Sequence, residues 1–352
     1  MKFKDKLYFA AEKTCYMLRT TLAPPPKDVY LIVNSKCNAK CIMCDVGLGI
    51  NTTFSNIMTK YGEMDLQIIK KTINDLWWKP KIRITSTEPL LYSKIDTAVR
   101  LYKKNNFFVS ITTNGILLDK YIEKIIQWNL DEIIVSLHGP PLINDKIFQI
   151  KVTDKIVASL KNLNKFRSKS LKIGINTVIM PINQNYIYET VNLYRDYVDF
   201  YILSHLNFVS EACAKKHNKL FPKYSMSPST VYGINPQEVD PEKLHYELKR
   251  TVMDFDVIII PKIYDKDSLF IYYKVPEKPL NKNQKCQVPW QCSQIAPTGD
   301  VLVSTRCFNI SMGNIKNQSF LSIWNGKLLR EFRKDLLYFK FFPVCNRCCG
   351  VF

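Results

Sequence analysis

Three cysteines lie within eight residues, at Cys37, Cys41 and Cys44, directly after a short β-branched run. Four thiolates would complete a zinc site or bind every iron of a 4Fe–4S cluster, whereas three leave one iron open to a further molecule. A zinc site would need a fourth ligand, and no further cysteine or histidine lies between Cys15 and His138. The group therefore favours an iron–sulfur cluster with one open iron.

A second group of six cysteines lies between Cys286 and Cys349. The chain has eleven cysteines in all, and this odd number argues against a disulfide framework and for metal or redox chemistry. Zinc and iron both remain open for the second group on these grounds. The two remaining cysteines, Cys15 and Cys213, are compatible with small core residues.

The composition is that of a globular protein, with 46% hydrophobic and 23% charged residues in a chain of 352. No apolar run reaches the ~18 residues of a membrane span. The basic first residues are soon followed by Glu12, Lys13 and Arg19, which does not resemble a signal peptide. We therefore expect a cytoplasmic protein without a transmembrane segment.

The net charge is +19, from 50 basic and 31 acidic residues. Dispersed lysines on solvated faces explain most of it, and their dispersion argues against a nucleic-acid partner. An acidic partner is the functional alternative. One cluster, which mildly favours an anionic substrate, comprises Lys161, Lys165, Arg167, Lys169 and Lys172.

About six βα repeats occupy residues 27–206, which predicts an α/β protein with a parallel sheet and crossover helices. The strands are expected at Val29–Val33, Ile82–Thr85, Phe107–Thr112, Glu132–Leu137, Ile173–Met180 and Phe200–Leu203. Six units suit a partial (β/α)6 TIM-like barrel, in which chemistry gathers at the carboxyl ends of the strands. The first three cysteines follow the first strand and would lie at that end.

The remainder of the chain changes character twice. Residues 207–285 are predicted to be an irregular connecting segment with a helix at Pro241–Met253 and a strand at Val257–Ile260. From residue 286 a small α+β domain is expected, with a hairpin around Pro297-Thr-Gly-Asp and a helix at Leu321–Leu337. The predicted divisions are an N-terminal extension (1–26), the barrel (27–206), the connecting segment (207–285) and a cluster-binding domain (286–352).

The spacing of Cys37, Cys41 and Cys44 resembles the signature of the radical S-adenosylmethionine (radical SAM) superfamily. In that superfamily the open iron of a 4Fe–4S cluster binds the amino and carboxylate groups of S-adenosylmethionine. An electron passed through the cluster releases a deoxyadenosyl radical, which abstracts hydrogen from a substrate. The resemblance implies this cluster and S-adenosylmethionine as cofactors.

Further motifs follow successive strands, as the resemblance requires. Ser86-Thr87-Glu88-Pro89 is similar to the Gly-Gly-Glu-Pro element that holds the methionine ammonium, with both glycines replaced. Thr113-Asn114-Gly115 resembles a Thr-Asn-Gly turn, and Val135–Gly139 an element whose serine contacts the cofactor. The cofactor contacts implied are Met43, Glu88, Asn114, Ser136 and Asn176.

Two residues are weak catalytic candidates. His138 could act as a base, although a hydrogen-bonded structural histidine is the favoured reading. Cys213 could act as an acid or base, although packing is favoured. Phe148 stands where many relatives carry an arginine that pairs with the cofactor carboxylate, and Lys146 is a possible substitute.

The C-terminal cysteines, with Gly299, Gly313-Asn-Ile and Ile323-Trp-Asn-Gly between them, resemble a SPASM or twitch extension that carries auxiliary iron–sulfur clusters. The resemblance implies one auxiliary 4Fe–4S cluster, because six cysteines are too few for two. The implied ligands are Cys286, Cys307, Cys345 and Cys348, with Cys292 as a rival for one position. Ser304 replaces a cysteine of the pattern, and a structural zinc site is the alternative.

The predicted function is that of a radical SAM oxidoreductase acting on an unidentified small molecule or peptide. The auxiliary cluster would accept the electron left after hydrogen abstraction, in a dehydrogenation-type oxidation. A flavodoxin or ferredoxin would supply electrons to the first cluster. The alternatives are a peptide- or sugar-modifying maturase and a non-catalytic metal-binding protein for nucleic acid.

Overall fold

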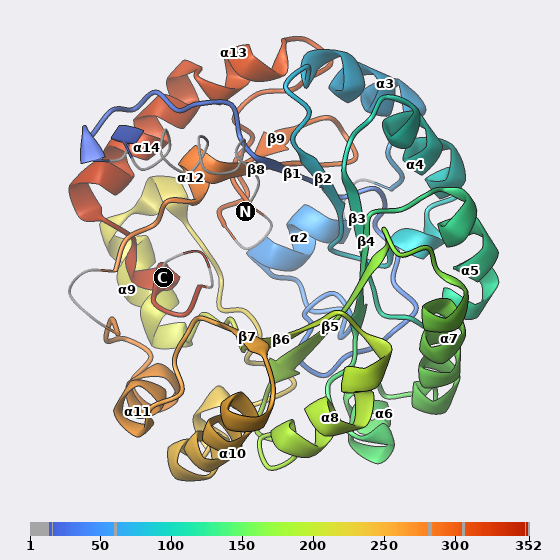
Figure 1. Cartoon of the computed structure of the whole chain (residues 1–352). Helices are drawn as coiled ribbons and strands as arrows, with labels where there is room; N and C mark the ends of the chain where they lie inside the picture. The colour runs from blue at the N-terminus through green and yellow to red at the C-terminus, as the bar shows by residue number, and fades with distance from the viewer. Residues whose placement is uncertain are drawn as a thin grey trace.

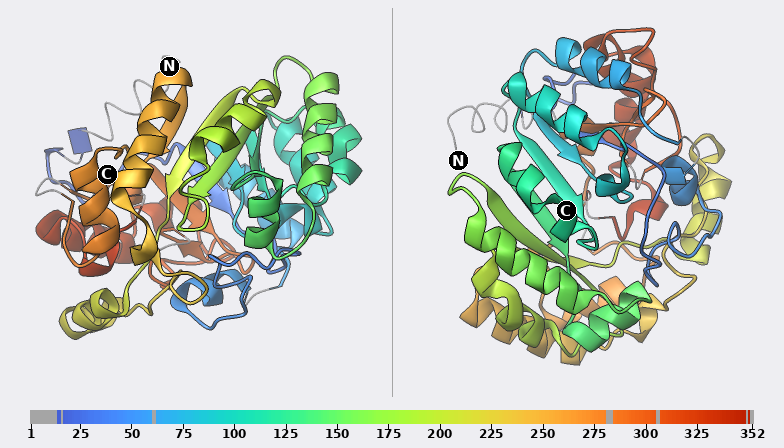
Figure 2. Two further views of the ribbon diagram at one scale, coloured as in Figure 1. Left: turned by 90° about the horizontal axis from the view of Figure 1, so that it is seen from below. Right: turned by 90° about the vertical axis from the view of Figure 1, so that its right-hand side faces the viewer.

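The computed structural model describes residues 14–350 except 16, 60–61, 281–283, 305–306 and 349. Its described strands form one sheet in the order β7-β6-β5-β4-β3-β2-β1-β8-β9. Strands β1 to β8 pair in parallel, and β9 pairs antiparallel with β8. Most of the helices surround the curved sheet on its outer side, whereas the helix at Thr53–Thr59 appears inside the ring in the view of Figure 1 (Figures 1 and 2).

The strands are β1 (Asp28–Leu31), β2 (Lys81–Ile84), β3 (Val109–Thr113), β4 (Glu132–Ser136), β5 (Lys172–Ile179), β6 (Phe200–His205), β7 (Val257–Ile260), β8 (Cys292–Ile295) and β9 (Val301–Leu302). The helices are α2 (Thr53–Thr59), α3 (Leu66–Asp75), α4 (Ile95–Lys104), α5 (Leu118–Gln127), α6 (Pro141–Phe148), α7 (Thr153–Phe166), α8 (Ile187–Tyr194), α9 (Glu211–Leu220), α10 (Pro241–Asp254), α11 (Lys266–Lys274), α12 (Val288–Gln291), α13 (Phe320–Trp324) and α14 (Lys327–Phe339).

The strands alternate between an apolar and a polar face. Residues such as Leu31 and Ile84 are fully buried in the main core, together with apolar residues of the surrounding helices. On the other face, Arg83 binds Asp28 (2.6 Å) and Glu132 (2.9 Å), which ties β1, β2 and β4 together. Because side chains on a strand point alternately to opposite faces, the apolar set fixes the sheet beneath its helices and leaves the inner face polar.

All six strands expected for the barrel are present as β1 to β6, side by side in chain order, and the C-terminal hairpin forms as β8 and β9. The segment 207–285 is more regular than expected, because it contains α9, α10 and α11 and its strand β7 extends the sheet beside β6. The prediction of a single helix at Leu321–Leu337 is wrong. This segment is divided into α13 and α14 at Asn325-Gly326, where Gly326 caps the second helix.

The C-terminal hairpin continues the barrel's own sheet. Strand β8 pairs with β1 in register, from Asp28 opposite Cys292 to Leu31 opposite Ile295. A second small core joins the same hairpin to α2, the helix that follows the first cysteine loop. It contains Ile32, Phe54, Ile57, Met58, Ala296 and Leu302. The first cysteine loop and the C-terminal hairpin are therefore packed together, and the division at residue 286 stays a prediction.

No helix within the described ranges is both long and apolar enough to cross a membrane.

Candidate functional site

Cys37, Cys41 and Cys44 lie on the loop that follows β1, at the carboxyl end of the parallel strands. The loop turns so that the Cys44 amide donates to the Cys41 carbonyl (2.9 Å). Cys41 interacts electrostatically with both other thiols, but within the described residues no three Cys, His, Asp or Glu side chains are arranged to hold a metal ion. Cys37 is exposed, and the other two are partly buried.

Although part of Cys37 reaches solvent, neighbouring atoms desolvate its thiol and raise its pKa, and burial raises the pKa of Cys41 more strongly above the usual value of a thiol. Such thiols stay protonated at neutral pH unless a positive metal centre compensates for the buried charge. Iron supplies that compensation, and three thiolates leave one iron of a 4Fe–4S cluster open. The residues present on this loop therefore fit the cluster expected from their spacing.

The residue after the third cysteine ties the loop to a distant segment. Asp45 is 1% exposed and accepts hydrogen bonds from the Thr52 hydroxyl (3.0 Å) and the Thr230 amide (2.9 Å). Nearby, Gly233 lies so close to the loop that an added Cβ would be 2.2 Å from the Ile42 carbonyl oxygen. The segment 227–233 thus lies against the cysteine loop, a contact that gave no signal in the sequence.

Replacing Gly233 by alanine is expected to push this segment away from the cysteine loop. Since the obstacle is backbone, neither side can move cheaply, and we expect a loss of about 1–3 kcal/mol in the free energy of unfolding. The first cluster should also be lost faster in air. Iron content and visible absorbance during exposure to air measure this, with the exposed neighbour Tyr232→Ala as control. Equal bleaching in the two variants would contradict the expectation.

Glu88 is buried beneath the site, with 1% of its surface exposed. Its carboxylate accepts from the amides of Leu90 (3.0 Å) and Asn114 (2.8 Å) and from the Thr113 hydroxyl (2.8 Å). These donors occupy both oxygens and hold the Thr-Asn-Gly turn against the turn that follows β2. The structure therefore places Glu88 as a support for both turns, and its direct contact with a cofactor stays a prediction.

Burial raises the pKa of Glu88 to about 7 despite these three donors. An unfolded glutamate titrates near pH ~4.3, so between that value and about 7 the folded chain binds the extra proton. We therefore expect the contribution of Glu88 to stability to decline as pH rises across this window and to be constant above it. Denaturant unfolding between pH 5.5 and 8 should show a flatter profile for Glu88→Gln, and identical slopes would refute the assignment.

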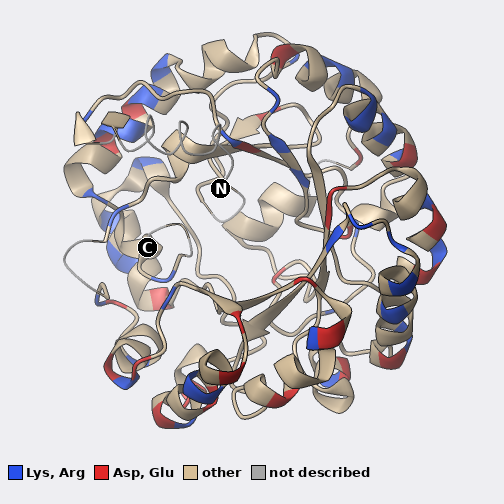
Figure 3. Cartoon of the chain, viewed as in Figure 1, with Lys and Arg blue, Asp and Glu red and all other residues tan. Residues whose placement is uncertain are grey.

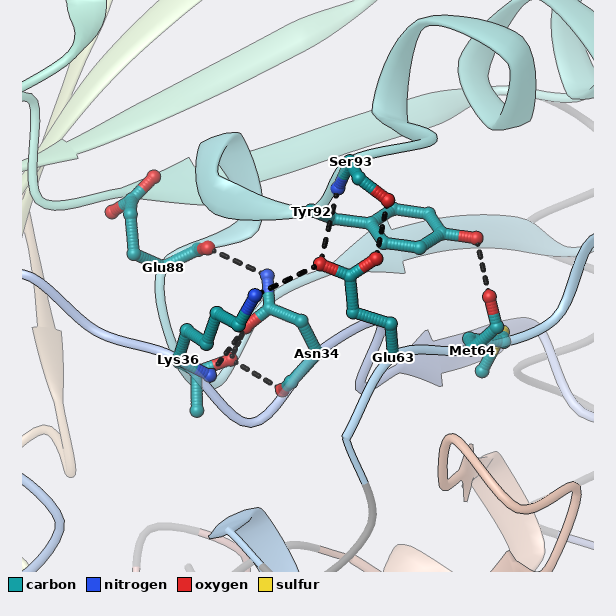
Figure 4. Close-up of polar contacts among 8 residues, drawn as sticks. Asn34, Lys36, Glu63, Met64, Glu88, Tyr92 and Ser93 are labelled. Atoms are coloured by element: carbon teal, nitrogen blue, oxygen red, sulfur yellow. Dashed lines mark hydrogen bonds and ion pairs between the residues drawn. The ribbon is translucent and has the colours of Figure 1, made fainter.

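Asn34, just past β1, connects the start of the cysteine loop with the turn after β2. Its Nδ2 donates to the Glu88 carbonyl (2.9 Å) and its Oδ1 accepts from the Lys36 amide (2.8 Å). Beside it, Glu63 binds Lys36 (3.5 Å) and the Ser93 hydroxyl (Figure 4). Asn34 was missed in the sequence, because a lone asparagine after a strand carries no specific signal.

The second cysteine group also gathers in space. Cys345 interacts electrostatically with Cys286 and Cys307, and the Cys348 amide donates to the Cys345 carbonyl (3.0 Å). Burial raises the pKa of Cys345 to about 12 and that of Cys307 further, so both thiols need a metal centre to ionise. These interactions bring Cys286, Cys307 and Cys345 near one another, and Cys348 follows Cys345 on the same turn, so their joint binding of one cluster stays a prediction. Cys292 begins β8 opposite Asp28, the first residue of β1.

Arg347, between the last two of these cysteines, anchors the pair to the barrel. Its guanidinium donates to the carbonyls of Ile271 (2.6 Å), Tyr272 (2.5 Å) and Val275 (2.7 Å) at the end of α11. Asn346 adds a bond to the Pro276 carbonyl (3.1 Å). A cation at the C-terminus of a helix satisfies carbonyls that have no partner within the helix, so the Cys-x-x-Cys segment is firmly held.

Comparison with known protein families supports both resemblances, to the radical SAM superfamily and to the SPASM domain. The sequence profile of the radical SAM superfamily matches residues 31–194, and that of the SPASM iron–sulfur cluster-binding domain matches residues 286–349. The chain belongs to the radical SAM superfamily. Members of the two families bind 4Fe–4S clusters and S-adenosylmethionine, so these are the cofactors of this radical SAM protein.

Among characterised relatives, a GTP 3′,8-cyclase of Clostridium botulinum (strain Hall) is 30% identical over 216 residues. That match covers 56% of this chain and 66% of the relative. A probable GTP 3′,8-cyclase of Methanococcus aeolicus is 34% identical over 161 residues, covering 44% and 50%. The radical SAM chain thus spans less than two thirds of the length of these relatives.

Two solved structures share the fold. Streptococcus suis SuiB bound to its precursor peptide SuiA matches with a TM-score of 0.64 at 15% identity, over 98% of this chain and 76% of SuiB. The anSMEcpe protein with bound S-adenosylmethionine matches with a TM-score of 0.59 at 16% identity, over 87% and 83%. These likenesses confirm the α/β fold with a partial TIM-like barrel.

The remaining residues implied as cofactor contacts form a row at the carboxyl ends of neighbouring strands. Ser136 on β4 is in register with Asn176 on β5, and Asn176 Oδ1 accepts from the Ser204 hydroxyl on β6 (2.6 Å). Asn114 Nδ2 lies 3.8 Å from Cys37 Sγ. Met43 is partly buried against the main core. The register brings the polar members of this set to one end of the barrel, and their contact with the cofactor stays a prediction.

The two catalytic candidates, His138 and Cys213, are both buried and hydrogen-bonded within the protein. His138 is 3% exposed, its Nδ1 accepts from the Val178 amide (3.1 Å), and burial lowers its pKa to about 3. Cys213 is 5% exposed and its thiol donates to the Pro276 carbonyl (3.4 Å). Neither group is placed for proton transfer to a substrate, so the packing interpretation is favoured for both. Phe148, at the expected arginine position, is buried against His138.

The basic cluster between Lys161 and Lys172 lies away from the cysteine loop. Lys172 begins β5, which runs parallel to β1, so it lies at the opposite end of the sheet. Arg167 and Lys172 both pair with Asp199, and most other charges line the outer helices (Figure 3). This cluster therefore gives no support to an anionic substrate at the cluster site.

A cavity of about 400 Å³ opens between the end of β5 and the segment that covers the cysteine loop. Its lining includes Pro181, Ile182, Gln184, Gly233 and Ile234. Gly233 also contacts Ile42 of the cysteine loop, so this space lies beside the first cluster site. Its size is within the range of small-molecule sites.

Proposed function

We propose that this radical SAM protein cleaves S-adenosylmethionine reductively at a cluster held by Cys37, Cys41 and Cys44 and oxidises an organic substrate. The observation that carries the proposal is the set of three cysteines on one loop at the carboxyl end of the parallel strands, beside the supported Glu88 turn. The bound cluster and cofactor would supply a deoxyadenosyl radical. The chain's own residues hold the loop, keep one iron free of protein ligands and orient the turns around it.

The second cysteine group would complete a two-electron oxidation. After one hydrogen atom leaves a substrate C–H bond, the substrate still has one electron and one proton to lose before a double bond forms. Four thiolates, from Cys286, Cys307, Cys345 and Cys348, leave no iron open, and this favours electron acceptance by the auxiliary cluster over substrate binding to it. Arg347 holds two of these ligands against the barrel, where the radical would form.

The electron donor would approach the exposed side of the first loop. Cys37 is exposed, as are its neighbours Lys36 and Lys40. Basic side chains around an exposed ligand favour an acidic one-electron carrier of the flavodoxin or ferredoxin type, since opposite charges accelerate encounter. The net charge of +19 acts in the same direction.

The substrate class has two candidates. SuiB, whose fold covers nearly the whole chain, binds a precursor peptide, which favours peptide modification. The clostridial and methanococcal relatives are named GTP 3′,8-cyclases, which favours a purine nucleotide. We favour a peptide, because the match to SuiB extends through both cysteine groups.

The experiment is anaerobic incubation of reconstituted, reduced protein with S-adenosylmethionine, with 5′-deoxyadenosine measured by chromatography. We expect product in the wild type and none in Cys41→Ala. A parallel reaction with GTP separates the substrate classes, because a cyclase should turn over faster and form a modified purine. Absence of 5′-deoxyadenosine from fully reconstituted protein would refute the proposal.

A further inference from the structure

One hydrogen bond joins the C-terminal hairpin to the turn that follows β2. Gln294 of β8 donates from its Nε2 to the Ser86 hydroxyl oxygen (3.2 Å). Gln294 is 1% exposed, so its amide is almost fully removed from water. In the sheet, β1 lies between β8 and β2, and the bond therefore spans a whole strand.

Ser86 has a backbone conformation that glycine favours. Its φ is +105°, and Ser86 stands at the first glycine of the superfamily's Gly-Gly-Glu-Pro element. A side chain in this region costs about 1–3 kcal/mol and persists only where the surroundings fix it. Here Gln294 binds the side chain, and the adjacent Thr87 hydroxyl binds the Asn34 carbonyl (2.7 Å).

The bond from Gln294 leaves the hydroxyl proton of Ser86 available. Within the part of the chain that the structure describes, no acceptor of this proton is found among the hydrogen bonds. The turn lies against the cysteine loop, because the Glu88 amide donates to the carbonyl of Lys36 (3.0 Å), the residue before Cys37. The turn that carries Ser86 would therefore lie beside the methionine end of a cofactor bound at the open iron.

The arginine that pairs with the cofactor carboxylate in many relatives has no counterpart at the matching position of this chain. Phe148 occupies the expected arginine position and is 1% exposed in the core. Lys146, the other candidate, lies on the same helix α6. A hydroxyl donor on the turn after β2 would supply part of the recognition that an arginine gives in relatives.

We infer that Gln294 is a positioning residue for S-adenosylmethionine, holding Ser86 so that its hydroxyl donates to the cofactor carboxylate. The cofactor site is then built from both the barrel and the C-terminal hairpin. This inference rests on the proposed function, which requires S-adenosylmethionine at the first cluster.

The test compares Gln294→Met, which keeps the side-chain volume, with Gln291→Met on the preceding helix. Gln291 bonds only weakly to Gln287 (3.3 Å) and serves as the matched control. Equilibrium dialysis of anaerobic, reconstituted protein measures the dissociation constant for S-adenosylmethionine. We expect about 3- to 10-fold weaker binding for Gln294→Met, the effect of losing one hydrogen bond, with unchanged iron content. The cofactor-induced change in the electron paramagnetic resonance spectrum of the reduced cluster should shift to higher cofactor concentration in parallel.

Ser86→Gly tests the same pair from its other end and suits this backbone conformation. It should weaken binding to a similar degree, and the double variant should be no weaker than either single variant. Wild-type affinity in Gln294→Met, or additive effects in the double variant, would overturn the inference. A wild-type protein that fails to bind the cofactor would instead overturn the proposed function.

Discussion

Alanine at Cys37, Cys41 and Cys44 together is expected to lower the iron content from about eight to about four atoms per chain, because one of two 4Fe–4S clusters is removed. Formation of 5′-deoxyadenosine should fall to background, since no other described group offers an open iron. The fold should persist, because these side chains lie on the loop between β1 and α2 and, of the three, Cys41 alone is among the residues that pack against the main core. Iron analysis after anaerobic reconstitution and chromatography of the reaction measure both effects.

The control for this first prediction is Cys15→Ala, which removes a thiol outside both cysteine groups. It should keep about eight irons. A triple variant that retains full iron would show that the N-terminal loop does not bind a cluster. A decrease from about four irons to none would show that the C-terminal thiols hold zinc or no metal, and electron acceptance by that group would then be excluded.

Replacing both Cys345 and Cys348 by alanine is expected to stop oxidation of the substrate while cleavage of S-adenosylmethionine continues. About four irons should be lost, while reductive cleavage of S-adenosylmethionine continues at the first cluster. Oxidation of the substrate should stop, because the electron left after hydrogen abstraction has no acceptor. The measurements are iron content and the yield of 5′-deoxyadenosine alongside that of oxidised product.

Cys292→Ala distinguishes the rival ligand in this second prediction. Because Cys292 starts β8 opposite Asp28, at the amino end of β1, its replacement should leave the iron content unchanged. Loss of the auxiliary cluster in Cys292→Ala, with retention in Cys307→Ala, would reverse the assignment of these two cysteines. Substrate oxidation at the wild-type rate in the Cys345/Cys348 variant would exclude the acceptor role.

The local sequence pattern was sufficient to predict the strands of the barrel and their order. Strands such as β2 and β4 alternate buried and half-exposed residues, and their order follows from short crossover helices. The helices α2 and α9 were missed, because the first is short and the second mixes Lys and His with few apolar residues. The division of α13 from α14 depends on a glycine whose close packing against Ser322 is visible only in three dimensions.

The sequence by itself determined the chemistry of this protein, because cysteine spacing is a local property that fixes how many thiolates can reach one cluster. Only the tertiary structure decided how the site is supported. The carboxylate of Glu88 is occupied by the chain's own donors, Asp45 binds a segment almost two hundred residues away, and Gln294 reaches Ser86 across β1. Such contacts join residues distant in the chain, and they arise from strand register and burial, which no local spacing encodes.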